Sequence, residues 1–352
     1  MTGQGRIGNP RRYGGKAETF KFQPQNAKLW DIIRFILRGG SDRVWRMNPN
    51  PVRYISSKPA MLGEICGRSL RLARTRNFLL LLAVILALGV RVDADELTTN
   101  IEYGLVGTNR LQLDASVPEG AGPFPVGIVV HGGGWASGDK EHDVAPMEIP
   151  LAAAKFTWFS IDYRLAPTNR WPAGFEDVQT AIRWVKAHAA EYKGDPRRIA
   201  LCGYSAGGHL VCLAATQAQP DTRVQAVLGY APPTDMVADN ERRHGLSKSL
   251  QLLFNLPPDL TPEARRTLAG ISPIEFVKPG LPPFLLIAGT ADKTVLYSQS
   301  INFQARLRAS GVTCDLITIT NAQHRITDWQ TFDPHFEEGI RDWLVKTLGE
   351  AK

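Results

Sequence analysis

One sharp turn, at residues 203–207, constrains this chain more than any other stretch. Residues 198–202 form a short, mostly apolar run and residues 206–216 are small and helix-compatible, so Ser205 lies at a predicted strand-to-helix junction. Glycines flank this serine in the spacing G-x-S-x-G. A serine on such a turn has strained backbone angles, and its neighbours must lack bulk. The turn lifts the hydroxyl out of the sheet and aims the N-terminus of the following helix at developing negative charge.

From residue 98 onward, apolar runs alternate with helical patterns. Two opening strands are predicted at 101–106 and 111–117, and later strands at 124–130, 156–163, 199–202, 224–230, 283–288 and 312–319. Helical patterns occur at 147–155, 175–190, 206–216, 297–309 and 334–348. This order predicts an α/β fold with a mostly parallel central sheet and helices on both faces. Residues 232–280, rich in proline and charge, are a candidate cap insertion.

A second glycine-rich stretch, H-G-G-G-W at residues 131–135, follows a predicted strand. Consecutive glycines let the main chain approach a ligand closely with its amides pointing inward. Acyl transfer needs such N–H donors where the tetrahedral oxyanion forms. We therefore assign the amides of Gly133, Gly134 and Ala206 to an oxyanion hole, with a plain flexible turn as the alternative. His131 is expected to hold this loop by hydrogen bonds rather than to act as a base.

An acid and a histidine are expected after the serine, in the order Ser, Asp, His. Asp292 follows an apolar run and therefore lies at the carboxyl end of a predicted strand. His324 follows the next strand, in a loop from which a general base can reach back to Ser205. His335 competes for this role, but near the start of the last helix it is expected to be exposed. His209, one turn into the helix after the serine, is expected to pack.

Together these motifs resemble the esterase and lipase branch of the α/β-hydrolase fold. The resemblance covers residues 97–349 and includes H-G-G-G-W, G-x-S-A-G-G, the run D-Y-R-L-A-P at 162–167 and the acid turn G-T-A-D at 289–292. W-P-A at 171–173 and D-V-Q-T-A-I-R-W at 177–184 are similar to the secreted feruloyl- and acetyl-xylan-esterase-like subgroup. The resemblance implies a serine carboxylic-ester hydrolase that forms an acyl-enzyme on Ser205, with Asp292 and His324 completing the triad. Its expected partner is a small-molecule or polysaccharide-linked ester, and no cofactor is implied.

Two other functions remain open at this stage. An amidase or exopeptidase would use the same fold and residues, whereas a catalytically silent binding module would not need the intact triad. No C-x-x-C or H-E-x-x-H spacing occurs, so no metal site is predicted. The three cysteines after residue 95 outline no disulfide framework.

The N-terminal segment has the layout of a secretory signal peptide. Basic residues at 68–76 precede an apolar stretch at 78–90, and Val92 and Ala94 stand at −3 and −1 of a cut after Ala94. We expect a signal peptide at 61–94 and an exported catalytic domain at 95–352. Retention of the apolar stretch as an uncleaved anchor would instead give a membrane-tethered protein. Residues 1–60 are expected to be a disordered basic extension or a start-site artefact.

The net charge of +7 is unevenly distributed. Residues 1–94 contain 17 Lys and Arg against 5 Asp and Glu, whereas the remaining residues contain 24 against 29. The predicted catalytic domain is therefore acidic, and no basic surface for nucleic acid is expected on it. The sequence leaves the oligomeric state open.

Overall fold

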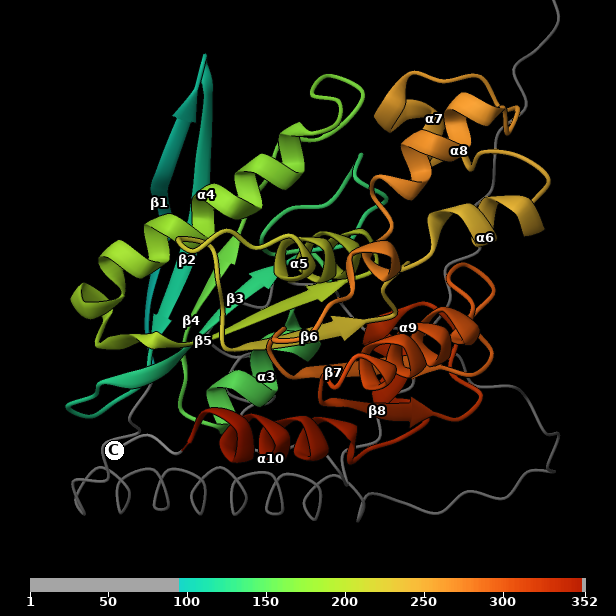
Figure 1. The fold of residues 1–352 in the computed structure, drawn as a ribbon. Coiled ribbons are helices and arrows are strands. Elements are labelled where there is room, and N and C mark those ends of the chain that lie inside the picture. Colours follow the sequence, from blue (N-terminus) through green and yellow to red (C-terminus); the bar gives the residue numbers. More distant parts are fainter. Residues whose placement is uncertain (1–94, 350–352) are drawn as a thin grey trace, which may run out of the picture. The chain divides into compact units, whose positions relative to one another are not determined.

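The structure, a computed structural model, describes residues 95–349 (Figure 1). The expected basic extension at 1–60 and signal peptide at 61–94 lie outside the described residues, as does the alternative anchor at 78–90. No helix in the described part of the chain is long and apolar enough to cross a membrane.

Eight strands form one sheet in the order β1-β2-β4-β3-β5-β6-β7-β8. The strands are β1 Glu96–Val106, β2 Asn109–Val117, β3 Phe124–Val130, β4 Thr157–Ile161, β5 Gly194–Tyr204, β6 Ala226–Tyr230, β7 Phe284–Gly289 and β8 Cys314–Ile319. Strand β2 is antiparallel to both of its neighbours, and all other pairs are parallel. The predicted mostly parallel sheet is confirmed.

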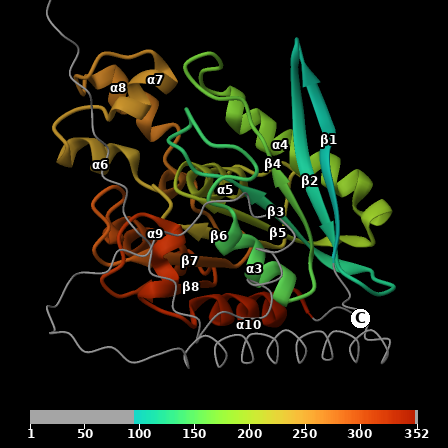
Figure 2. The ribbon, with the colours of Figure 1, turned by 180° about the vertical axis from the view of Figure 1, so that it is seen from behind.

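Helices cover both faces of this sheet (Figures 1 and 2). One layer contains α4 Ala173–His188, α5 Ala206–Thr216 and α9 Tyr297–Ala309, and the other contains α3 Ala145–Ala153 and α10 Phe336–Leu348. Successive strand residues point to opposite layers, because side chains alternate along a strand. In β3, Ile128 and Val130 belong to the core on the α5 side, whereas Val129 belongs to the core on the α10 side. A strand buried on both faces must be apolar throughout, and this explains the unbroken apolar run of β3.

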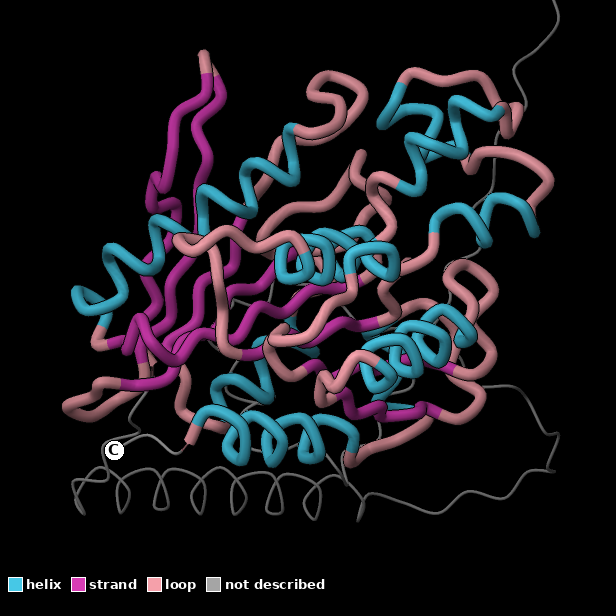
Figure 3. Tube along the Cα trace, viewed as in Figure 1, coloured by secondary structure: helices cyan, strands magenta, loops and turns pink. Residues whose placement is uncertain are grey.

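Residues 232–280, the candidate cap, contain three short α-helices and one 3-10 helix, Pro273–Phe276, joined by loops (Figure 3). Helices α6 Met236–Arg242, α7 Lys248–Phe254 and α8 Pro262–Ala269 lie between β6 and β7 in the chain. Each begins at a side chain that accepts a hydrogen bond from an amide of the first turn; the three side chains are Asp235, Ser247 and Thr261. A hydrogen bond of this kind at the start of a helix stabilises helices that are too short to persist by themselves. The segment lacks a long apolar periodicity because it is built from these short, capped units.

Candidate active site

The predicted functional residues lie in the loops that follow the carboxyl ends of β3, β5, β7 and β8, which are parallel strands. In the registers of this sheet, Val130 of β3 pairs with Gly203 of β5, and Gly289 of β7 pairs with Ile319 of β8. The loops after these strands carry the glycine-rich stretch, the serine, the acid and the histidine. The carboxyl ends of neighbouring parallel strands meet at one edge, which is where α/β sheets bind ligands.

Ser205 occupies the sharp turn between β5 and α5. Its backbone angles are φ 52° and ψ −115°, a conformation that few residues other than glycine adopt. Two hydrogen bonds hold the turn: the Ser205 N–H donates to the Tyr230 carbonyl at 2.8 Å, and the His209 N–H donates to the Ser205 carbonyl at 2.9 Å. A Cβ added at Gly207 would overlap the carbonyl oxygens of Val130 and His131. The second glycine of the motif therefore lets the helix start pass directly beside the end of β3.

His324 lies between Ser205 and Asp292. Its Nε2 atom is 2.8 Å from the Ser205 Oγ atom, and its Nδ1 atom is 2.6 Å from Asp292 Oδ2. The Asp292 side chain is 1% exposed and the His324 side chain 20% exposed, so the carboxylate is shielded while the ring borders solvent. The alternative histidine, His335, is 77% exposed and contacts Glu338. The structure thus brings together the three side chains that the sequence singled out.

The Asp292 carboxylate has a partner for each oxygen. While Oδ2 faces the histidine, Oδ1 accepts hydrogen bonds from the Thr294 N–H at 2.8 Å and the Val295 N–H at 3.0 Å. Two N–H donors on one oxygen restrict the rotation of the side chain. The carboxylate is consequently fixed in position with its second oxygen directed at His324.

Neighbouring aromatic residues hold the loop of His324 in place. The Tyr204 hydroxyl donates to the His324 carbonyl at 2.8 Å, and the two rings lie 5.2 Å apart. On the other side, the Trp329 Nε1–H donates to the Gln323 carbonyl at 2.7 Å. The ring of His324 is thus oriented by its own backbone as well as by Asp292.

The glycine-rich loop lies against the serine turn. Gly133 and Gly134 have φ values of +109° and +61°, which glycine adopts without strain. A Cβ at Gly132 would lie 2.8 Å from the Tyr204 ring, next to the serine. Among residues 95–349, the N–H groups of Gly133, Gly134 and Ala206 donate to no other protein atom. Amides without a protein acceptor are therefore found in the loop that contacts Tyr204 and at the residue after the serine, and an oxyanion hole requires such donors.

The ring of His131 holds the glycine-rich loop, as expected, and its contacts are with Tyr163 and Gly132. Its buried ring stacks on Tyr163 at a centroid distance of 4.3 Å, and its Nδ1 atom is 2.6 Å from the Gly132 carbonyl oxygen. The Tyr163 hydroxyl donates to the His131 carbonyl at 3.2 Å. Burial lowers the pKa of His131 to about 4, so the ring is neutral at pH 7. Tyr163, from the D-Y-R-L-A-P run, therefore holds the glycine-rich loop, a role that the sequence did not indicate.

His209 is buried, as expected, but it also links three segments. Its Nδ1 atom accepts a hydrogen bond from the Trp135 indole N–H at 3.2 Å, and its Nε2 atom is 2.7 Å from the Ile271 carbonyl oxygen. Burial lowers its pKa to about 4. One neutral ring therefore connects helix α5 to the glycine-rich loop and to the end of the candidate cap. Within residues 95–349, no group of His, Cys, Asp and Glu side chains is arranged to hold a metal ion.

The sheet order, the strained serine turn and the loops at the carboxyl ends of the strands define the α/β-hydrolase fold. The chain belongs to the BD-FAE family, whose pattern it matches over residues 113–307. This match includes Ser205 and Asp292 and ends before His324, whose place beside the serine rests on the sequence pattern and on the contact at 2.8 Å.

The chain is also similar to proteins that are named as ester hydrolases. Over 197 residues the chain is 34% identical to the probable carboxylic ester hydrolase LipM of Mycobacterium tuberculosis, covering 53% of this chain and 46% of LipM. Esterase LipC of the same organism is 36% identical over 200 residues, covering 53% of this chain and 49% of LipC. The chain thus spans about half the length of these relatives. A truncated carbohydrate esterase from gut microbiota superposes with a TM-score of 0.60 at 25% identity, covering 74% of this chain and 99% of that structure.

Proposed function

We propose that this protein is an exported serine carboxylic-ester hydrolase that acts through Ser205, His324 and Asp292. The observation that carries the proposal is the unbroken series of contacts from the Ser205 hydroxyl through the His324 ring to the Asp292 carboxylate, at 2.8 and 2.6 Å. The similarity to carboxylic ester hydrolases of Mycobacterium tuberculosis supports the same class of reaction.

In the proposed reaction the Ser205 Oγ atom attacks the ester carbonyl carbon while His324 Nε2 takes the hydroxyl proton. The amides of Gly133, Gly134 and Ala206 hydrogen-bond the oxyanion of the tetrahedral intermediate. When the intermediate collapses, His324 returns the proton to the leaving alkoxide, and an acyl-enzyme remains. A water molecule, deprotonated by the same nitrogen, then releases the carboxylic acid and restores Ser205. Asp292 holds the Nδ1–H tautomer and stabilises the imidazolium.

We propose esters carried on carbohydrates as the substrate class. The likeness to a carbohydrate esterase supports this choice. A hydrolysis panel of acetylated xylan, feruloylated sugars and short- and long-chain p-nitrophenyl esters tests it. The highest kcat/KM is expected on an acylated sugar, and a maximum on long-chain p-nitrophenyl esters would contradict the proposal.

Substitution of the serine tests the mechanism. Ser205→Ala removes the attacking oxygen, so turnover of p-nitrophenyl acetate should fall by at least about a thousandfold. Ser310→Ala, at the end of α9, is the matched control and should keep full activity. A fluorophosphonate probe should label the unchanged protein at Ser205 and leave Ser205→Ala unlabelled. Failure to label would favour a silent binding module, whereas faster cleavage of a matched amide than of its ester would favour an amidase.

Export is tested separately, by N-terminal sequencing of the protein recovered outside the cytoplasm. Cleavage after Ala94 predicts a mature chain that begins at Asp95. A chain that still contains residues 78–90 and sediments with membranes would instead be anchored.

A further inference from the structure

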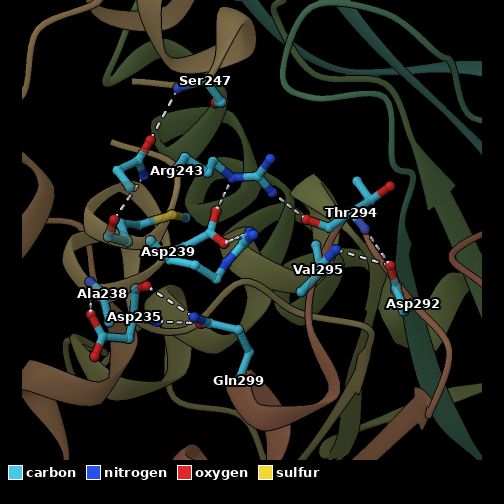
Figure 4. A network of polar contacts seen from close by, with 12 residues as sticks. Asp235, Ala238, Asp239, Arg243, Ser247, Asp292, Thr294, Val295 and Gln299 are labelled. Atoms are coloured by element: carbon cyan, nitrogen blue, oxygen red, sulfur yellow. Dashed lines mark hydrogen bonds and ion pairs between the residues drawn. The ribbon is translucent and has the colours of Figure 1, made fainter. Parts of the chain in front are cut away.

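The candidate cap is tied to the turn that carries Asp292 through Arg243, the residue after helix α6 (Figure 4). The Arg243 guanidinium donates a hydrogen bond to the Thr294 carbonyl oxygen. Its Nε–H donates to Asp239 Oδ2 at 2.7 Å, which fixes the direction of the side chain. A cation on the cap therefore reaches the main chain two residues beyond Asp292.

The peptide group that Arg243 contacts is the one that contacts Asp292. The Thr294 carbonyl and the Val295 N–H belong to the same planar peptide group, and the Val295 N–H donates to Asp292 Oδ1 at 3.0 Å. The contacts therefore run from a guanidinium through one peptide to a carboxylate. Hydrogen bonds in such a series polarise one another and strengthen together. Because the peptide is planar, any tilt of its carbonyl also tilts the N–H that faces Asp292.

A second contact holds the other end of helix α6 to the same segment. The Gln299 Oε1 atom, at the start of α9, accepts hydrogen bonds from the Thr234 N–H at 2.8 Å and the Asp235 N–H at 2.7 Å. The Gln299 amide also donates to the Asp235 carbonyl at 3.1 Å. Both ends of α6 are thus bound to the stretch between Asp292 and Gln299, as Figure 4 shows.

The neighbouring arginine provides an internal comparison. Arg242 also binds Asp239, at 2.6 Å, and is 41% exposed. Among the described residues, the contact found for Arg242 is this ion pair, and none joins it to the Asp292 turn. The two arginines therefore share a partner and differ in the contact to Thr294.

We propose that Arg243 is a positioning residue for the catalytic acid. It holds the peptide between Thr294 and Val295 so that the N–H stays directed at Asp292, and the carboxylate in turn stays directed at His324. This inference rests on the proposed function, because it assigns to Arg243 a role in ordering that triad. Under this proposal the candidate cap contributes a residue that helps to order the active site.

The test compares Arg243→Met with Arg242→Met in the full-length protein. Methionine keeps an unbranched stem but has no donor. Arg243→Met should lower kcat on p-nitrophenyl acetate about tenfold with KM unchanged, since one hydrogen bond to a charged side chain is lost. Arg242→Met should change neither constant. In parallel, the far-downfield proton resonance of the hydrogen bond between His324 Nδ1 and Asp292 should shift or broaden in Arg243→Met alone.

The outcomes separate this inference from the proposed function. If the unchanged protein hydrolyses no ester and takes up no fluorophosphonate, the proposed function fails. If the unchanged protein is active and the two variants have equal kcat values, the role of Arg243 is overturned. A lower kcat with an unaltered downfield resonance would also overturn it, because the effect would then lie outside the acid. Arg243→Ala gives the same expectations should the methionine variant fold poorly.

Discussion

Gly203 and Gly207 are required because of atoms in the neighbouring main chain. A Cβ on Gly203 would overlap the carbonyl of Gly207, and a Cβ on Gly207 would overlap the carbonyls of Val130 and His131. Both overlaps involve main-chain atoms, which cannot rotate away as a flexible side chain would. The turn therefore depends on the absence of side chains at two positions as much as on the serine between them.

This requirement gives a prediction at the residue scale. Gly207→Ala should lower the free energy of unfolding by about 2–3 kcal/mol and reduce esterase activity, because the helix start must move away from β3. Gly339→Ala, in helix α10, is the matched control: its Cβ would find only the Ile317 side chain, at 3.4 Å. That change should raise stability by about 0.5–1 kcal/mol. Urea unfolding of both variants checks the pair, and equal stabilities would contradict the steric argument.

The three residues of the proposed triad were singled out from local pattern, whereas the contacts that support them were not. Asp292 and His324 each follow an apolar strand, and the chain order of the triad directed attention to them. Arg243 contacts a residue 51 positions away, and His209 contacts one 62 positions away. No spacing rule marks such contacts, because they depend on how residues 232–280 pack against the rest of the described chain.

At the scale of elements, helix α4 is fixed to the D-Y-R-L-A-P run by one buried ion pair. The Arg164 guanidinium donates to both Asp177 oxygens at 2.7–2.9 Å, and the Arg164 N–H donates to Asp177 Oδ2 at 2.8 Å. Asp177 is 1% exposed and Arg164 is 12% exposed. Tyr163, the residue before Arg164, holds the glycine-rich loop. The ion pair therefore helps to position that loop through Tyr163.

Asp177→Asn should therefore lower the free energy of unfolding by about 3 kcal/mol, because it leaves the Arg164 charge buried without its partner. Glu176 also contacts Arg164, at 3.3 Å, but is 57% exposed. Glu176→Gln should cost less than about 1 kcal/mol. Thermal unfolding at pH 7 distinguishes the two, and a loss from Glu176→Gln as large as that from Asp177→Asn would refute the buried-pair argument.

The limits of the elements were predicted less well than their order. Strand β5 begins at Gly194, five residues before the predicted start, because Asp195 and its arginine neighbours, Arg197 and Arg198, interrupt the apolar pattern. These charges pair with one another at the entry to the strand. An ion-paired strand end cannot be told from a polar loop by hydrophobic periodicity.

At the scale of the whole described chain, two apolar layers, one on each face of the sheet, form the core. Two buried histidines, His131 and His209, lie in the layer on the α5 side. His131 and His209 are 1% and 0% exposed, and burial lowers the pKa of each to about 4. In the unfolded chain both return to an ordinary pKa near 6.5. Between these values the unfolded state binds more protons than the folded state. The contribution of each neutral histidine to the free energy of unfolding is therefore fully present above pH 6.5 and is lost as the pH falls toward 4.

The free energy of unfolding should accordingly fall by about 2–3 kcal/mol per histidine between pH 7 and pH 4.5. His209→Gln removes one titrating group and keeps a donor for the Ile271 carbonyl. Its slope of unfolding free energy against pH should be smaller by about one proton in this range. His335→Gln, at an exposed site, should leave the slope unchanged. Guanidinium unfolding across the range provides the measurement, and identical slopes for both variants would exclude this source of acid sensitivity.

The order of the strands also has a consequence for biosynthesis. The imidazole proposed to activate Ser205 is encoded 119 residues after it, and it contacts the hydroxyl from the loop after β8, which pairs with β7. A growing polypeptide on the ribosome therefore carries an inert serine until nearly the whole chain has been translated. If the proposed export moves the chain unfolded, this contact between the two side chains would form only after translocation.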